Sequence, residues 1–277
     1  MSRESLFRCP VCASQLYVNE KTFSCRKGHA FDISASGYVN LLTAGGKHSR
    51  FPGDDKEMAR ARRDFLSGGY YSPLAGALSE IARTYAADGS VFLDAGCGEG
   101  YYTSAVCGAL SRAGRTFRAA GFDISKFTLK YAPKRAPDAE FAVASSYRIP
   151  MGDARADILL NCFSPLALSE FRRVLKPGGA FLYVVPAREH LYEMKEILYE
   201  HPYENEEKKT PYEGFKYEDI VPVKSVLSLD DPADIENLFK MTPYFWKTPR
   251  AGRERLSDLS SLRVTAAFNI HIFKKEA

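Results

Sequence analysis

The sequence predicts an α/β protein with a doubly wound, mostly parallel sheet, preceded by a small metal-binding β module. Two observations lead to this fold class. From about residue 74, apolar strand-like runs alternate with helical segments, which is the pattern of successive βαβ units. Ahead of them, residues 9 to 32 read CPVCASQLYVNEKTFSCRKGHAFD, and three cysteines and a histidine there are spaced like metal ligands.

The composition is that of an ordinary globular protein. The 277 residues suffice for one large domain or two unequal ones, and 45% apolar with 26% charged residues is ordinary for a globular protein. The net charge is +4, and residues 1–63 hold eleven Lys and Arg against six Asp and Glu, so a polyanionic partner would bind near the front. We see neither a signal peptide nor the roughly 20 apolar residues of a membrane helix, and expect a cytoplasmic protein without membrane contact.

The first element is the expected metal clip, Cys9-x2-Cys12-x12-Cys25-x3-His29. Leu16 and Val18 alternate ahead of an Asn-Glu-Lys turn, which predicts a β-hairpin that returns the second ligand pair to the first. Four protein ligands leave no open position, so a structural zinc ion is favoured over a catalytic one. The alternative is three free cysteines beside a surface histidine.

A connection and a helix come next. Residues 34–53 are rich in Gly and Ser and read as irregular. Residues 54–67 read as a helix, with Asp54 and Asp55 at its positive end and Gly68 and Gly69 after it. This segment also carries a run of arginines, which would form either a solvated face or an RNA contact: Arg60, Arg62 and Arg63.

The alternating region then predicts a helix, strand and helix at 73–86, 91–96 and 100–113, a strand and short helix at 117–125 and 127–135, and strands at 139–146 and 156–165. A helix at 168–176 and a strand at 178–187 follow, and residues 189–210 read as a helix running into a charged loop. The chain closes with a helix at 230–242 and a β-rich stretch at 261–273. Parallel strands joined by helices require right-handed crossovers.

The turn after the strand at 91–96 predicts a nucleotide-type cofactor. Asp94 is followed by Gly96-x-Gly98-x-Gly100, and glycines there let a ligand approach the backbone. The spacing differs from the GxGxxG of dinucleotide enzymes, and a carboxylate suits an amino-acid moiety better than a pyrophosphate. This favours S-adenosylmethionine. Asp123, at the end of the next strand, could accept both ribose hydroxyls. The alternatives are a helix cap for Asp94 and a turn former for Asp123.

The motifs VFLDAGCGEG, GFDIS, ASSYRIPM and FRRVLKPGGAFLYV together resemble those of class I S-adenosylmethionine-dependent methyltransferases, over residues 74–190. The resemblance implies a Rossmann-like methyltransferase sheet. In that fold the loop after the third strand holds the adenine, which implicates Ser145 and Ser146. Many relatives have an aspartate there, so this chain would use a serine hydroxyl or backbone instead.

The resemblance becomes closer when CPVC, GHAFD, GYVNLL, PGD, ARRDFL, MTPYFW and FNIH are added. The whole pattern is similar to the bacterial 23S rRNA guanine-N1 methyltransferases. It implies an N-terminal zinc module that recognises an RNA hairpin, a catalytic domain behind it, and a homodimer. Carried over by position, the zinc ligands are Cys9, Cys12, Cys25 and His29. The positions matching cofactor contacts are Tyr71, Gly98, Glu99 and His190.

These patterns give a division into a zinc-binding RNA-recognition module at 1–35, a linker and helix at 36–73, and a methyltransferase domain at 74–277. Phe163 and Pro165 would frame a flipped target base, although Cys162-Phe163-Ser164-Pro165 departs from the aromatic-Ala-Pro turn of relatives. Cations expected at RNA phosphates are Arg8, Arg26, Lys27, Lys47 and Arg50. The competing hypothesis is a methyltransferase for a small molecule, with a purely structural zinc module.

Overall fold

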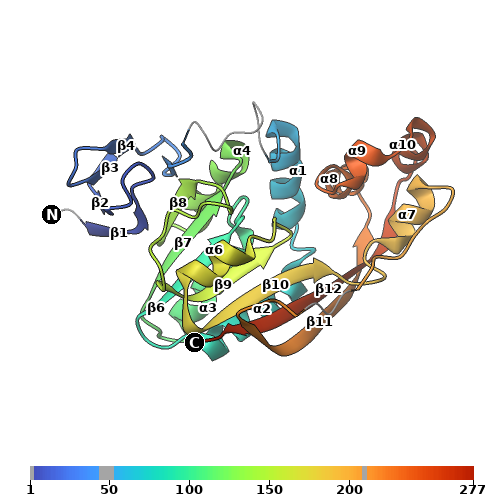
Figure 1. The fold of residues 1–277 in the computed structure, drawn as a ribbon. Helices are drawn as coiled ribbons and strands as arrows, with labels where there is room; N and C mark the ends of the chain where they lie inside the picture. Colours follow the sequence, from blue (N-terminus) through green and yellow to red (C-terminus); the bar gives the residue numbers. More distant parts are fainter. Residues whose placement is uncertain (1–2, 44–52, 208–210) are drawn as a thin grey trace.

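A computed structural model describes residues 3–43, 53–207 and 211–277, which form two sheets (Figure 1). The small N-terminal sheet is antiparallel, with the order β1 (Arg3–Arg8), β2 (Gln15–Val18), β3 (Thr22–Cys25) and β4 (Ala30–Asp32). The expected hairpin is confirmed, because β2 pairs with β3 and Leu16 lies opposite Cys25. We call residues 3–32 the N-terminal module.

The large sheet has the order β11-β12-β10-β9-β6-β7-β8-β5. Its parallel strands are β5 (Val39–Asn40), β6 (Ser90–Ala95), β7 (Phe117–Asp123), β8 (Ala139–Val143), β9 (Ala156–Cys162) and β10 (Leu175–Pro186). The antiparallel strands at one end are β12 (Leu262–Lys275) and β11 (Phe215–Leu229). The chain winds outward from β6 through β7 and β8, then returns to β9 on the other side. The expected doubly wound, mostly parallel sheet is therefore confirmed, with its switch point between β6 and β9.

The helices connect and flank these strands: α1 (Lys56–Ser67), α2 (Ser72–Tyr85), α3 (Tyr101–Arg112), α4 (Lys126–Leu129), α5 (Ala132–Arg135), α6 (Leu168–Val174), α7 (Tyr192–Leu198), α8 (Pro232–Lys240), α9 (Tyr244–Lys247) and α10 (Arg250–Ser257). Asp55 caps α1 by accepting hydrogen bonds from the N–H groups of Glu57 and Met58. The single short helix expected at 127–135 is instead two, because Pro133 has no N–H to continue a helix.

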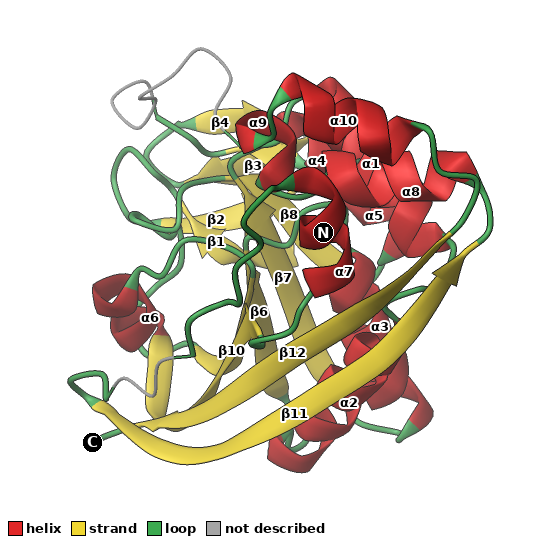
Figure 2. Cartoon of the chain, turned by 90° about the vertical axis from the view of Figure 1, so that its right-hand side faces the viewer, coloured by secondary structure: helices red, strands yellow, loops and turns green. Residues whose placement is uncertain are grey.

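Three features escaped the sequence analysis. Strand β5 forms within the segment expected to be irregular, and it pairs with β8. Strand β11, where the sequence analysis predicts no element, is a 15-residue edge strand that carries charges and Pro222, which an edge position tolerates (Figure 2). The short helices α9 and α10 follow α8 and form a lobe with it and α7 at one end of the molecule (Figure 1).

The two faces of the large sheet are covered differently. On one face, Phe92 and Leu160 pack in a core cluster with α2 and α3. On the other face, Leu93 and Phe122 belong to a cluster that includes α6 and residues of the N-terminal module, such as Phe7. Residues 144–155, between β8 and β9, form no helix. The module therefore occupies part of the layer that a crossover helix fills in a doubly wound fold.

A buried carboxylate fastens the module to this face. Glu140 of β8, with a 3% exposed side chain, accepts hydrogen bonds from the hydroxyl of Ser5 (2.5 Å) and the N–H of Leu6 (3.0 Å). Its other oxygen pairs with Arg118 at 3.0 Å and Arg3 at 3.3 Å. The predicted module boundary at residue 35 stays a prediction; β4 ends at Asp32 and the next strand already belongs to the large sheet. No helix of the described residues is long and apolar enough to cross a membrane.

Candidate functional site

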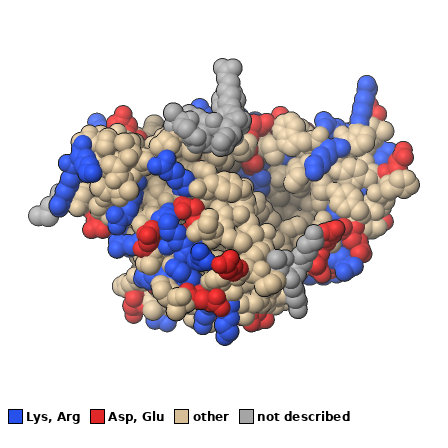
Figure 3. Space-filling model, viewed as in Figure 1, with Lys and Arg blue, Asp and Glu red and all other residues tan. Residues whose placement is uncertain are grey.

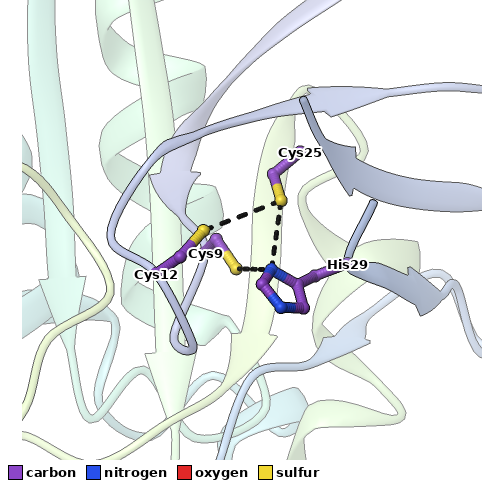
Figure 4. A group of neighbouring side chains, drawn as sticks. All are labelled: Cys9, Cys12, Cys25 and His29. Atoms are coloured by element: carbon purple, nitrogen blue, oxygen red, sulfur yellow. Dashed lines mark hydrogen bonds between the residues drawn. The ribbon is translucent and has the colours of Figure 1, made fainter. Parts of the chain in front are cut away.

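The four predicted metal ligands come together in the N-terminal module (Figure 4). Cys9 and Cys12 lie on the turn after β1, Cys25 ends β3, and His29 lies just before β4. Their ligand atoms all lie within 4.8 Å of one another. The positive φ of Gly28 (85°) lets the chain turn between Cys25 and His29.

The spacing of these atoms fits a tetrahedral zinc ion. Zinc bonds of about 2.3 Å to sulfur and about 2.0–2.1 Å to nitrogen place tetrahedral ligands about 3.8 Å apart for two sulfurs and about 3.5 Å apart for sulfur and nitrogen. The Sγ atoms of Cys12 and Cys25 lie 3.8 Å apart, and the Nδ1 of His29 lies 3.5 Å from the Sγ of Cys9 and 3.4 Å from that of Cys25. The three thiols and one imidazole therefore match a closed structural site.

A second site is a cavity of about 1190 Å³ at the carboxyl ends of the parallel strands. It is lined by the turns after β6, β7, β8 and β9, by α1, and by residues between α8 and α9. The space-filling view shows the surface hollowed between the central sheet and the α8–α10 lobe (Figure 3). Its place at the switch point of a doubly wound sheet is where such folds bind ligands. Single-ligand pockets usually measure about 300–1,000 Å³, so this cavity has room for a cofactor and a second group.

The glycine turn forms one wall. Gly96 has a φ of +85°, and a Cβ atom there would meet the Oγ of Ser164 at 2.0 Å, so only glycine fits. Gly98 also has a positive φ, and its N–H donates to Asp123 at 3.0 Å. Gly100 caps α3 against Ala132 and lies behind the cavity wall. The predicted turn is thus present, with its backbone open to a ligand on one side.

The three acidic residues of this region differ in their surroundings. Asp94 lies behind the turn and accepts a hydrogen bond from Thr103 at 2.6 Å, and burial raises its pKa to about 7. Asp123 lines the cavity and also accepts from the N–H of Ser125 at 2.8 Å; burial raises its pKa to about 6. Glu99 also lines the cavity, and burial, opposed by Arg135, raises its pKa to about 7.

Glu99 provides a test of whether a cofactor fits. Its side chain is 1% exposed, and Arg135 lies 2.6 Å from Oε2. Its other oxygen, Oε1, has no hydrogen-bond partner among the described residues. A buried acceptor without a donor is costly, and a ligand hydroxyl or amine would relieve that cost. Together with the open backbone of the glycine turn, this fits S-adenosylmethionine, which carries both groups.

Tyr71 and His190 face the same cavity from the opposite side. Both are buried, and their rings pack around Phe268 with centroid distances of 4.9 and 4.6 Å. The Nδ1 of His190 accepts from the N–H of Ala267 at 3.2 Å, so Nε2 carries the proton. Burial, reinforced by Lys195, lowers the pKa of His190 to about 3. His190 is therefore a neutral donor at physiological pH.

The remaining expected cavity residues also line it: Ser145, Ser146, Phe163 and Pro165. Phe163 has a φ of +53°, which is strained for a bulky residue, and its side chain is exposed. Such strain persists only where surrounding structure enforces it, and it is often found at functional sites. Thus of the twelve predicted cofactor and base-site residues, Asp94 and Gly100 alone lie behind the wall.

The predicted RNA-binding cations lie near the metal cluster where they are described. Arg26 and Lys27 are exposed, and Arg26 lies over the ring of Tyr17. Arg8 is partly buried and donates to the carbonyl of Ala13. Lys47 and Arg50 lie outside the described residues. Figure 3 shows further Lys and Arg side chains gathered below the N-terminal module, with acidic side chains among them.

The sequence analysis missed part of the cavity wall. Arg62 lies in this wall, where its side chain is 24% exposed, pairs with Asp54 at 2.7 Å and donates to the carbonyl of Met241. An aromatic rim was also missed: Tyr203, Tyr244 and Trp246. Trp246, the one tryptophan of the sequence, is 61% exposed at the cavity mouth. Nothing in the motif MTPYFW indicates that this side chain is exposed.

Comparison with known proteins agrees with both sites. Residues 7–50 match the zinc-ribbon family described as "RlmA, N-terminal", and residues 92–179 match a methyltransferase domain. The chain is 34% identical to YxjB of Bacillus subtilis (strain 168), provisionally named a 23S rRNA (guanine-N(1)-)-methyltransferase, with 98% of each chain covered. It is 35% identical to the 23S rRNA (guanine(748)-N(1))-methyltransferase of Streptomyces fradiae, with 69% and 67% covered.

Solved structures show the same fold. The YcgJ protein of Bacillus subtilis superposes with a TM-score of 0.52 at 16% identity, covering 73% of this chain and 99% of that one. The Haloferax volcanii methyltransferase crystallised with the Trm112 activator gives 0.51 at 20% identity, covering 81% and 99%.

Proposed function

Because the chain belongs to the 23S rRNA (guanine-N1)-methyltransferase family, we propose that it transfers the methyl group of S-adenosylmethionine to N1 of a guanine in a hairpin loop of 23S ribosomal RNA. The observation that carries the proposal is that one loop both contacts the metal module and lines the cavity. Arg148 donates to the carbonyl of Pro10, between Cys9 and Cys12, at 3.1 Å. Ser145 and Ser146, which line the cavity, lie on the same loop as Arg148.

The cavity residues divide into two groups in this proposal. Asp123 accepts the ribose hydroxyls, Ser145 and Ser146 contact the adenine, and the N–H groups of the glycine turn meet the amino-acid portion. Glu99, Tyr71 and His190 complete the cofactor half, with Asp94 and Gly100 shaping the turn from behind. Phe163, Pro165 and the aromatic rim border the half that takes the target base.

S-adenosylmethionine supplies an electrophilic methyl group on a sulfonium, and the protein contributes mainly alignment. Guanine N1 carries a proton at neutral pH, and in a loop it must leave the base stack to reach the cavity. The exposed ring of Phe163 offers a stacking surface at the mouth. Its strained backbone fixes the direction in which that ring points.

The N-terminal module would address the enzyme to its RNA. Arg26 and Lys27 are exposed beside the metal cluster, and Tyr147, which is 70% exposed, lies at the cavity mouth next to Arg148. We include Arg8, Lys47 and Arg50 in the same phosphate-binding set. We further propose a cytoplasmic homodimer, as rRNA methylation and the family resemblance suggest; the mass of the protein in solution tests the dimer.

The test is transfer of labelled methyl from S-adenosylmethionine to unmodified 23S rRNA, with the product mapped by primer extension, since N1 methylation blocks pairing. A single stop at a guanine supports the proposal. Deleting residues 1–35 would remove Arg3, Ser5 and Leu6 from Glu140 and leave it with Arg118, so the module is better probed with Arg26→Glu and Lys27→Glu together. Cofactor binding without any transfer to RNA would instead favour the small-molecule hypothesis.

A further inference from the structure

A buried lysine behind the aromatic rim has no place in the function described so far. Lys195, on α7, is 0% exposed. Its Nζ donates to the carbonyl of Tyr203 at 2.9 Å and to the Oδ1 of Asn205 at 2.8 Å. No carboxylate of the described residues lies within ion-pair distance of it. A buried ammonium with only neutral partners is expensive, and that cost calls for an explanation.

The ammonium sits directly behind the cavity wall. Nζ lies 4.6 Å from the ring centroid of Tyr203 and 5.7 Å from that of Tyr244. Both rings, and Asn205, line the cavity, whereas Lys195 does not. The charge is therefore separated from the cavity by one layer of aromatic rings rather than by water. Electrostatic effects across such a layer are much less screened than in solvent.

We propose that Lys195 is a positioning residue for the target base: it holds Tyr203 and Asn205 against the cavity, and its charge favours the N1-deprotonated guanine. The inference rests on the proposed function. N1 loses its proton to water, its electron pair forms the bond to the methyl carbon, and the carbon–sulfur bond breaks with its pair left on sulfur. A fixed positive charge near the developing guanine anion lowers the free energy of removing the N1 proton.

Other groups around Lys195 do not compete for this role. His190 stays neutral, because burial and the Lys195 charge lower its pKa to about 3. Burial lowers the pKa of Lys195, and the charge of Glu204, which also pairs with Arg188, raises it. On the packed elements, Glu193 is held by Thr265 of β12, and Arg255 of α10 donates to the carbonyl of Ile197. The carboxyls whose pKa burial raises to about 6 or 7 (Asp94, Glu99 and Asp123) lie in the cofactor half and are present in both the parent and the variant.

The experiment measures the pH dependence of kcat for full-length protein on 23S rRNA, at saturating S-adenosylmethionine, for the parent and Lys195→Met. The variant should be about tenfold slower at pH 7 and should converge with the parent at high pH, where guanine ionises unaided, a shift of about one pH unit. Its cofactor Kd and RNA KM should be unchanged. Lys224→Met, which removes an exposed lysine paired with Glu189, is the matched control and should change nothing.

If Lys195→Met does not fold, Asn205→Asp provides the second variant, because a carboxylate 2.8 Å from Nζ cancels the charge while Lys195 remains. The same pH shift is expected. A loss of kcat that is equal at every pH, or a loss of cofactor affinity alone, would overturn the inference and leave the proposed function intact. Absence of methyl transfer by the parent protein would overturn both.

Discussion

At the scale of single residues, the cofactor half of the cavity depends on a few positions where chemistry and space are both restricted. Gly96 cannot carry a side chain, and Asp123 joins the ends of two strands by accepting from Gly98 and Ser125. Glu99 keeps one buried oxygen, Oε1, without a donor among the described residues. The unpartnered oxygen of Glu99 costs stability in the isolated protein, and a ligand donor in the cavity would relieve that cost.

Gly96→Ala should abolish cofactor binding and destabilise the fold, because the new Cβ would lie 2.0 Å from the Oγ of Ser164. Gly114→Ala is the matched control, since Gly114 has a φ of +70° but nothing within 4 Å. It should lose only the about 1–2 kcal/mol of a left-handed residue with a Cβ, with cofactor affinity unchanged. Calorimetric titration and thermal unfolding measure both, and equal effects would contradict the steric argument.

Cofactor affinity should fall as the pH drops below about 6. Burial raises the pKa of Asp123 to about 6, so the carboxyl takes up a proton there and accepts ribose hydroxyls less well. Above that pH it is ionised and its contribution is fully present. Asp123→Asn should bind weakly at all pH values and lose the part of the decline centred near 6, as measured by Kd from pH 5 to 8. A decline that persists unchanged in this variant would assign it to other carboxyls, such as Glu99.

At the scale of elements, the N-terminal module replaces a crossover helix on one face of the sheet. Residues 144–155 carry no helix, and Phe7 packs in the same cluster as Leu93 and Phe122. The module is joined to the body through β1, which pairs with β2 and anchors to Glu140. It is therefore a structural layer of the catalytic domain as well as a metal site.

Glu140→Ala should cost about 3 kcal/mol of unfolding free energy, because the buried groups of Ser5 and Leu6 lose their acceptor. Glu4→Ala is the control: Glu4 also joins the module to the body, through Arg155 at 3.6 Å, but that pair is half exposed. Its removal should cost less than about 1 kcal/mol. Urea unfolding measures both free energies. Similar losses for the two variants would show that Glu140 contributes no more to the attachment of the module than the exposed Glu4 pair does.

Prediction from sequence succeeded where the spacing of particular residue types has one structural interpretation. The spacing of Cys9, Cys12, Cys25 and His29 brought the cluster together, and the order of strands gave the parallel sheet and its switch point. Prediction failed where contacts between distant parts of the chain determine the structure. The sequence analysis predicts no element at residues 215–229, where β11 pairs with β12. It leaves Arg62 either on a solvated face or at an RNA contact, whereas Asp54 and Met241 hold it in the cavity wall. No local signal places Tyr203 beside Tyr244.

At the scale of the whole molecule, the exposed cations of the N-terminal module and the position of the cavity both bear on how an RNA would bind. The loop of Arg148 joins the metal cluster to the cavity, because Arg148 contacts Pro10 while Ser145 and Ser146 line the cavity; Arg26 and Lys27 are exposed in the N-terminal module. A single RNA loop contacting both ends would be held by phosphate contacts at the module while one base enters the cavity.

Arg26→Glu with Lys27→Glu should weaken RNA binding and lower the salt dependence, with the slope of log K against log salt falling by about 1.5 for two lost phosphate contacts. Arg115→Glu is the control, because Arg115 precedes β7 and so lies at the opposite, amino end of the sheet. It should leave the slope unchanged. Filter binding at several salt concentrations measures this; equal slopes in both variants would remove Arg26 and Lys27 from the interface.

The attachment of β1 to Glu140 also has a consequence for how the chain is made. Ser5 and Glu140 are 135 residues apart, so at about 5–20 residues per second the ribosome exposes the first roughly ten seconds before it supplies the second. During that interval Phe7 and Leu6 have no sheet to pack on. Metal binding by the four nearby ligands can fold these strands as soon as they emerge, because the strands and the ligands all lie within residues 3–32. Metal binding early in synthesis would thus fold the N-terminal module before the strands that it packs against have been made.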